Sequence, residues 1–219
     1  MEAKSISVEV KKTARIHLLG NDLNPSVIWF VLHGYGHLST YFIKKFECLN
    51  LEKTLIVAPE GLHRFYLSGQ SGRVGASWMT KEERLEDIKD YVNYLDDLDE
   101  NIMKRIHSNP KKVVLGFSQG AATASRWIAK GKVTPDIFVL WASVFPPDMD
   151  FESDRIKFNS PRTILVQGNE DEYYTTDHFE THQKELNTYN IHYQTIKYKG
   201  KHNIYNEPLI DIQNQLKID

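Results

Sequence analysis

The chain has 219 residues, of which 41% are apolar and 26% are charged. Both fractions are close to those of ordinary globular proteins and argue against disorder, and the length suits one domain spanning residues 1–219. The formal charge of −2 at pH 7 gives no general attraction to nucleic acid or to anionic lipid.

Compartment and redox state follow from the cysteine content and the N-terminal composition. The single cysteine, Cys48, excludes an intramolecular disulfide. The first twenty residues contain no apolar run that resembles a signal peptide. No later stretch approaches the roughly 20 apolar residues of a membrane span. We therefore expect a cytoplasmic protein without a membrane span.

Apolar runs typical of strands alternate with helical patterns from the start of the chain. Residues 8–10 and 16–19 are predicted to form an opening antiparallel pair of strands. The continuous apolar runs 27–32 and 54–59 predict buried strands, with a helix over 39–49 between them.

The next segment, residues 64–78, is rich in Gly and Ser and has no clear period, which predicts irregular structure. Thr80 and Glu83 match a capping box. Apolar residues then recur every three or four positions, so we expect one long amphipathic helix that reaches about residue 106.

The second half of the chain continues the alternation of strands and helices. The predicted strands are 113–115, 137–141, 163–167 and 192–198. A helix that ends near Gly131 follows the first of them, a loop joins the second to the third, and a helix over 177–189 precedes the last. This order predicts an α/β fold with a mostly parallel sheet and helices on both faces.

The most informative motif is Gly116-Phe117-Ser118-Gln119-Gly120, a G-x-S-x-G sequence between a predicted strand and an Ala-rich helix. In a nucleophile elbow the serine occupies a sharp, strained strand-to-helix turn. Positions two before and two after it must be nearly without side chains, and both are glycine. The alternative is an ordinary glycine-flanked turn, and the other motifs of the sequence are needed to distinguish the two.

A serine nucleophile needs a histidine base that is oriented by a carboxylate. After Ser118, one predicted strand ends before Asp171 and the last strand ends before His202. This is the chain order Ser, Asp, His of α/β-hydrolases. Glu170 and Glu172 are close enough to replace Asp171 as the carboxylate.

Two other histidines suggest a metal site as an alternative interpretation. His178 and His182 lie four residues apart on a predicted helix and could share a metal ion. The segment lacks the His-Glu-x-x-His order of metalloproteases and has no obvious third ligand, so a surface helix is the preferred interpretation. We expect no metal and no cofactor.

The oxyanion of the reaction intermediate needs two preorganised donors. The backbone N–H of Gln119 follows the serine at the start of a helix. The turn His33-Gly34-Tyr35-Gly36, after the strand 27–32, would direct the N–H of Tyr35 inward. His33 is expected to support this turn without taking part in the chemistry.

Together these motifs resemble the phospholipase/carboxylesterase family of α/β-hydrolases, which includes bacterial carboxylesterases and acyl-protein thioesterases. The resemblance rests on residues 30–36, Gly116 to Ala122, and the pairs Gly168 with Asp171 and Gly200 with His202. It implies a hydrolase with little or no lid and no cofactor. It also implies Ser118, Asp171 and His202 as the triad, with Tyr35 and Gln119 as oxyanion donors.

Substrate preference is less determined by the sequence. Family members often have Trp-Phe-Asp where this chain has Trp78-Met79-Thr80. The segment 65–75 shows no apolar run that suits a tunnel for long acyl chains. Trp78, Phe65 and Tyr66 are candidates for a substrate pocket or for ordinary core aromatics.

We therefore expect a serine esterase for small-molecule esters with short to medium acyl chains. One alternative is a thioesterase, acting on acyl proteins or small molecules, or a lysophospholipase with the same triad. A more distant alternative is a non-catalytic ligand-binding module, which would not need a strained elbow. Either a monomer or a homodimer fits the sequence.

Overall fold

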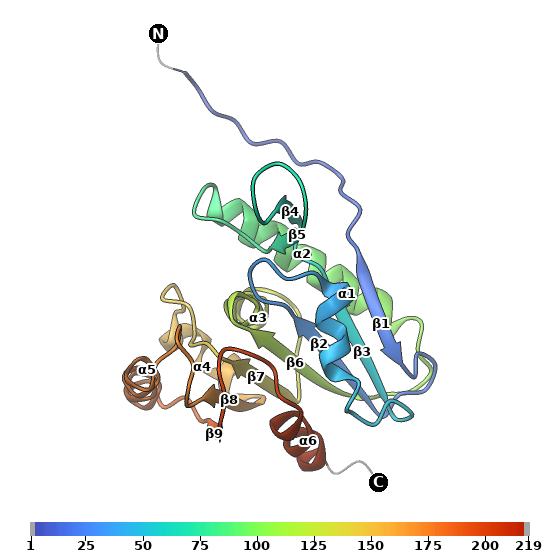
Figure 1. Cartoon of the computed structure of the whole chain (residues 1–219), viewed down its shortest axis with the longest axis vertical. Helices are drawn as coiled ribbons and strands as arrows, with labels where there is room; N and C mark the ends of the chain where they lie inside the picture. Colours follow the sequence, from blue (N-terminus) through green and yellow to red (C-terminus); the bar gives the residue numbers. More distant parts are fainter. Residues whose placement is uncertain (1–2, 217–219) are drawn as a thin grey trace.

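The computed structural model describes residues 3–216, and within them seven strands form one sheet in the order β1-β3-β2-β6-β7-β8-β9 (Figure 1). In that order their bounds are Ile16–Gly20, Thr54–Pro59, Val27–Leu32, Lys111–Phe117, Ile137–Trp141, Arg162–Gly168 and Gln194–Tyr198. β1 runs antiparallel to β3, and the other neighbouring strands are parallel. The predicted fold class is confirmed.

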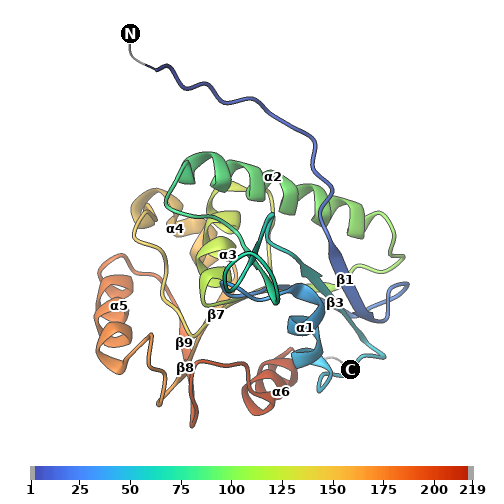
Figure 2. The ribbon, with the colours of Figure 1, turned by 45° about the horizontal axis from the view of Figure 1, so that its top comes forward.

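Helices cover both faces of the sheet (Figures 1 and 2). One face shares a hydrophobic core with α2 (Arg84–Met103), α3 (Gln119–Lys130), α4 (Phe151–Asn159) and α5 (Thr176–Thr188). The other face packs against α1 (Ser39–Phe42), the 3-10 helix η1 (Ile43–Phe46) and α6 (Asn206–Gln215). Within the described residues, no helix combines the length and the apolar character needed to cross a bilayer.

The side chains of the inner strands contribute to two hydrophobic cores, one on each face of the sheet. β2 and β3 are buried along their whole length, which is why their sequences are continuously apolar. Successive side chains serve opposite faces, so Phe30 packs in the core with α2 and α3, while Trp29 packs in the core with α1 and α6. Because these strands are parallel, their carboxyl ends meet at one edge of the sheet, where ligands bind in folds of this class.

The predicted antiparallel pairing of residues 8–10 with residues 16–19 is wrong, although residues 16–19 do form a strand. β1 pairs with β3, Ile16 opposite Pro59, and residues 8–10 are not a strand. The segment before β1 runs away from the body of the protein (Figures 1 and 2), and Val8 and Val10 are exposed. A three-residue segment centred on Glu9 offers too little apolar surface to add a strand, and Glu9 forms an ion pair with Lys89 on α2 instead (2.8 Å).

The segment 64–78 is more regular than predicted, because it contains the antiparallel hairpin β4 (His63–Tyr66) and β5 (Val74–Ser77). The predicted capping box does not form. Thr80 Oγ1 accepts the N–H of Glu82 (3.2 Å), and α2 begins only after Glu83, whose φ is 46°. Two helices were missed: α4, in which four of nine residues are charged, and α6.

Glu60, directly after β3, joins the first strand to the sheet. Its carboxylate accepts two hydrogen bonds from Arg15 (3.1 and 2.8 Å), one from Arg64 (3.0 Å), and two from the N–H and hydroxyl of Ser39 (3.2 and 3.1 Å). The side chain is 1% exposed. Burial raises the pKa of Glu60, but the hydrogen bonds of Arg15 and Ser39 and the charge of Arg15 outweigh it, so its pKa lies below the ordinary value.

We therefore expect Glu60→Gln to lower the free energy of unfolding at neutral pH by about 3 kcal/mol, because two guanidinium groups lose a buried carboxylate. Since the pKa is lower in the folded state, this stabilisation is present above the unfolded-state pKa, roughly 4.3, and is lost as the pH falls through the folded-state pKa. Urea unfolding from neutral to acid pH measures both effects. The exposed Glu47→Gln is the control, and an equal pH dependence of Glu60→Gln and wild type would contradict this account.

Candidate active site

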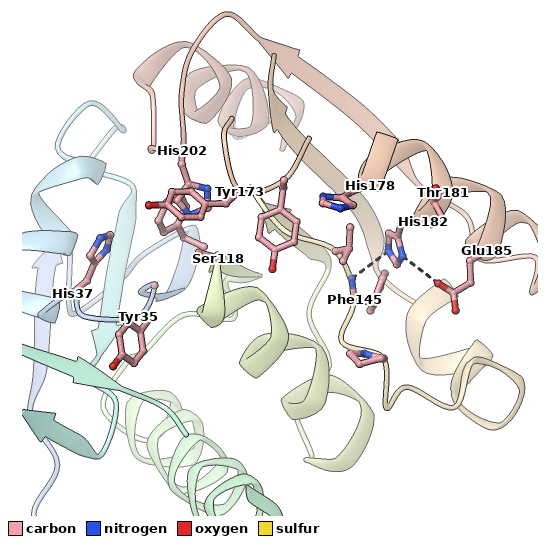
Figure 3. Close-up of a pocket in the computed structure, with 15 residues that line it drawn as sticks. Tyr35, His37, Ser118, Phe145, Tyr173, His178, Thr181, His182, Glu185 and His202 are labelled. Atoms are coloured by element: carbon pink, nitrogen blue, oxygen red, sulfur yellow. Dashed lines mark hydrogen bonds and ion pairs between the residues drawn. The ribbon is translucent and has the colours of Figure 1, made fainter. Parts of the chain in front are cut away.

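Ser118 lies between β6 and α3, on the sharp turn that its motif predicts. Its backbone has φ 54° and ψ −120°, a conformation that costs a residue with a side chain about 1–3 kcal/mol. Two backbone hydrogen bonds hold it: Ser118 N–H donates to Trp141 O (3.0 Å), and Ala121 N–H donates to Ser118 O (2.9 Å). The turn places Ser118 in a cavity beyond the ends of the parallel strands (Figure 3).

The two motif glycines are required by close backbone approaches. A Cβ on Gly116 would lie 2.3 Å from the carbonyl oxygen of Gly120 and 2.4 Å from Cα of Ala121. A Cβ on Gly120 would lie 2.2 Å from the carbonyl oxygen of Leu32, at the end of β2. Larger residues at either position would therefore push the start of α3 away from the sheet.

Asp171 and His202 meet beside this turn. His202 Nδ1 lies 2.8 Å from Asp171 Oδ2. Asp171 Oδ1 accepts the backbone N–H groups of Tyr173 (2.9 Å) and Tyr174 (3.0 Å), and its side chain is fully buried. With Nδ1–H donating to the carboxylate, the neutral imidazole keeps Nε2 available as a base.

Backbone contacts hold the two loops that carry these residues together. A Cβ on Gly168 would lie 2.4 Å from the carbonyl oxygen of Gly200. The N–H of Glu170 donates to Gly200 O (3.0 Å), and the N–H of Gly200 donates to the side chain of Asn169 (3.1 Å). The other two acids point elsewhere: Glu170 is exposed, and Glu172 forms a surface ion pair with Lys201 (3.1 Å). The structure thus brings Asp171 to His202.

Aromatic rings surround the imidazole. The centroids of Phe117, Tyr173 and Tyr174 lie 4.8, 4.9 and 6.2 Å from that of His202. Figure 3 shows His202 beside Ser118, and both line the same cavity. Among the described residues no hydrogen bond joins Ser118 to His202, as is common before substrate tightens a catalytic hydrogen bond.

The turn after β2 lies against the β4–β5 hairpin. Gly36 N–H donates to Ala76 O (2.8 Å), and Ala76 N–H donates to His37 O (3.1 Å). Among the described residues, the backbone N–H of Tyr35 has no hydrogen-bond acceptor. The hairpin, which sequence analysis missed, therefore supports the predicted oxyanion turn.

His33 supports the same turn from below, as expected. Its Nδ1 donates to Gly34 O (2.8 Å), and its Nε2 accepts the N–H of Gly61 (3.0 Å). Burial lowers the pKa of His33 to about 4, and the hydrogen bond to Gly34 opposes this only in part. The ring is therefore neutral at physiological pH and both its nitrogens are occupied.

Gln119 is the first residue of α3, where backbone N–H groups lack partners within the helix. Its side chain is held away from the cavity. Oε1 accepts the N–H of Trp78 (3.2 Å), and Nε2 donates to Met79 O (3.0 Å) and Ser77 Oγ (3.1 Å). The side chain thus anchors the segment after β5 to the turn at Ser118.

The cavity has a volume of about 920 Å³ and is open to solvent on one side. Its lining residues are Gly34, Tyr35, His37, Phe117, Ser118, Val144, Phe145, Pro147, Tyr173, Tyr174, His178, Thr181, His182, Glu185 and His202. These residues come from α5 and from the carboxyl ends of five strands, β2, β6, β7, β8 and β9, or the loops that follow them. The cavity therefore joins Ser118 and His202 to an additional wall formed by α5.

The three predicted pocket aromatics do not line this cavity. Trp78 is fully buried in the core and donates from Nε1 to His33 O (2.9 Å). Phe65 packs against the ring of Tyr35, with centroids 5.1 Å apart, and Tyr66 is half exposed on the hairpin. Trp78 thus has the core role that sequence analysis left open, and Phe65 supports the oxyanion turn from outside.

Cavity-lining residues that sequence reasoning missed lie on α5 and in the loop after β7. His178 and His182 were interpreted as a surface pair, but both line the cavity. His182 Nε2 accepts the N–H of Phe145 (3.2 Å), and Nδ1 faces Glu185 (3.5 Å). Burial lowers the pKa of His182. No group of three or more metal-binding side chains occurs in the described part of the chain.

Comparison with solved structures identifies the fold. Acyl-protein thioesterase 2 from Zea mays matches with a TM-score of 0.72 at 17% identity, covering 93% of this chain and 98% of that one. Esterase PE8 gives 0.69 at 18% identity, with 94% and 99% covered. A carboxylesterase from Mesorhizobium loti gives 0.69 at 16% identity, with 93% and 94% covered. These are all hydrolases by name, and at such identities they establish the shared fold.

Sequence comparison gives the family. No curated protein sequence matches the chain. The family profile described as Phospholipase/Carboxylesterase matches residues 20–219, which include every strand of the sheet except the first four residues of β1. The chain therefore belongs to the phospholipase/carboxylesterase family of α/β-hydrolases.

Proposed function

We propose that this chain is a serine hydrolase that cleaves carboxylic acyl esters, with Ser118 as nucleophile, His202 as base and Asp171 as the residue that orients His202. The observation that carries the proposal is the 2.8 Å hydrogen bond between His202 and the buried Asp171, which holds His202 at the cavity that Ser118 enters on a strained turn. Membership of a hydrolase family supports it.

The reaction would proceed in two halves. Ser118 Oγ attacks the acyl carbon while His202 Nε2 takes its proton, and the protonated imidazole then gives that proton to the leaving alcohol. Water, deprotonated by the same nitrogen, cleaves the resulting acyl-enzyme. The buried Asp171 carboxylate stabilises the imidazolium in both halves, and its own charge is held by the N–H groups of Tyr173 and Tyr174.

The oxyanion of each tetrahedral intermediate would lie between the N–H groups of Tyr35 and Gln119. The Gln119 N–H is at the N-terminus of α3, where the helix dipole favours negative charge. Tyr35 is placed by the turn that His33 and the β4–β5 hairpin hold rigid. Fixed donors of this kind need no reorganisation when the charge develops.

The cavity wall supports substrates with short to medium acyl chains. Val144, Phe145 and Pro147 give it an apolar side, but the wall continues onto exposed polar residues of α5. A thioester is the alternative substrate of the same triad, and the similarity to a protein named acyl-protein thioesterase 2 supports testing it. An S-acyl analogue assayed beside its ester separates the two.

Replacement of Ser118 tests the nucleophile. Ser118→Ala is expected to abolish labelling by a fluorophosphonate and to lower kcat for p-nitrophenyl butyrate by about 10⁴-fold or more, because no acyl-enzyme forms. The exposed Ser71→Ala is the matched control and should behave as wild type. Absence of labelling of the wild type, or equal labelling of Ser118→Ala, would overturn the proposed function.

Replacement of Asp171 tests the carboxylate. Asp171→Asn keeps an oxygen for the N–H groups of Tyr173 and Tyr174 but presents an amide donor to His202. The imidazole then adopts the wrong tautomer, so kcat/KM should fall by about 10³–10⁴-fold. Glu172→Gln, next to it on the surface, should leave kcat/KM nearly unchanged. A large loss in Glu172→Gln with none in Asp171→Asn would reassign the role.

Acyl-chain preference can be measured with p-nitrophenyl acetate, butyrate, octanoate and palmitate. Each methylene that reaches the apolar wall gains up to about 0.8 kcal/mol, whereas those beyond it meet exposed polar side chains and water. We expect kcat/KM to rise from acetate, to be highest at butyrate or octanoate, and to fall at palmitate. A continued rise to palmitate would show that the cavity accepts long chains.

A further inference from the structure

One face of α5 forms the wall of the cavity remote from Ser118. His178, Thr181, His182 and Glu185 all line the cavity. Residues three and four apart lie on the same face of a helix, which is why these four share one side of α5. Figure 3 shows them together at the end of the cavity away from Ser118.

Glu185 is oriented by a buried histidine. His182 Nε2 accepts the N–H of Phe145 (3.2 Å), so its proton lies on Nδ1, which faces Glu185 Oε2 at 3.5 Å (Figure 3). The His182 side chain is 5% exposed and that of Glu185 is 54% exposed. This contact holds the carboxylate of Glu185 at the rim of the cavity.

Within the described residues, the lining of the cavity provides no permanent cation to balance that carboxylate, since it contains neither lysine nor arginine, and Glu185 is the one acidic residue in it. Burial lowers the pKa of both His37 and His182, which disfavours a positive charge on either ring. A positively charged ligand would therefore meet a carboxylate that no lysine or arginine of the cavity lining pairs with.

Aromatic side chains complete the surroundings that suit a cation. The ring of Phe145 lies at this end of the cavity, with its centroid 5.5 Å from that of His182, whereas Tyr173 and Tyr174 line the cavity beside His202. The face of an aromatic ring attracts ammonium groups, most strongly where water is partly excluded. A carboxylate with an aromatic ring nearby, at the end of a cavity lined by further rings, favours a quaternary or primary ammonium group over an anion.

We propose that the substrate of this hydrolase carries a cationic ammonium group at the end remote from the scissile ester, and that Glu185 binds this charge. The proposal rests on the proposed function, because Ser118 defines which bond is cleaved. It makes Glu185 a specificity-determining residue and His182 the positioning residue that orients it. The chemical step itself requires neither.

Matched pairs of esters test this. On the acyl side, the p-nitrophenyl ester of an ω-trimethylammonio acid is compared with an ester of equal length that ends in a tert-butyl group. On the alcohol side, butyrylcholine is compared with 3,3-dimethylbutyl butyrate. We expect wild type to prefer the cationic member of at least one pair by about fivefold in kcat/KM, the size of an ion pair at a half-exposed carboxylate. Added salt should weaken that preference.

Glu185→Gln keeps an acceptor for His182 but removes the charge. It should bring the cationic-to-neutral ratio close to one, chiefly by lowering kcat/KM for the cationic ester. Glu180→Gln, an exposed glutamate of α5 outside the cavity, should retain the wild-type ratio. A wild-type ratio of one or less for both pairs, or a ratio that survives Glu185→Gln, overturns the proposal.

The experiments distinguish failure of this charge site from failure of the proposed hydrolase function. If wild type hydrolyses the neutral esters, turnover measures the ratio directly. If it hydrolyses none, calorimetric binding of the same esters to Ser118→Ala, with and without Glu185→Gln, gives the comparison without turnover. Tighter binding of the cationic ester that requires Glu185 supports the charge site. Equal binding of both esters rejects it.

Discussion

The close approach of α3 to the carboxyl ends of β2 and β6 determines the geometry of the site. It leaves no room for a side chain at Gly116 or Gly120, since an added Cβ would lie 2.3 Å and 2.2 Å from backbone oxygens. The chain can turn this tightly only if Ser118 takes a φ of 54°. The cost of that strain is met by burial of α3 on the sheet, where Ala121 and Ala124 are fully buried.

The same approach connects separate parts of the site. Once α3 starts at the sheet edge, the side chain of Gln119 reaches Trp78 and Met79, and Trp78 in turn donates to His33 O below the oxyanion turn. The turn at Ser118 and the turn after β2, which carries the proposed oxyanion donor, are thus linked through one buried tryptophan. The loops of Asp171 and His202 are joined independently through backbone contacts. Two rigid units therefore meet across the cavity.

The sequence predicted the features that depend on local backbone demands. The buried strands, the elbow around Ser118 and the strand-end positions of Asp171 and His202 each follow from neighbours in the chain. What it missed depends on distant partners. Residues 64–78 form a hairpin because β4 and β5 pair with each other while the hairpin packs on the turn at Gly36 and His37. α4 has little apolar periodicity, and only Phe151 and Phe158 are buried within it.

The position of α5 at the cavity is another feature that depends on distant partners and could not be predicted from the sequence. Helical spacing places His178 and His182 on one face, but only the tertiary structure shows that this face borders the cavity. The hydrogen bond from Phe145 N–H to His182 fixes the loop after β7 to the helix, so the apolar and polar walls are positioned together.

The groups that would perform the chemistry lie on loops at the ends of the sheet, and those that would select the substrate lie on α5. Because α5 touches neither Ser118 nor Asp171 by a hydrogen bond within the described residues, its polar face can change without disturbing the elbow. The proposed selection of the substrate by α5 is therefore physically separable from the arrangement of the proposed triad.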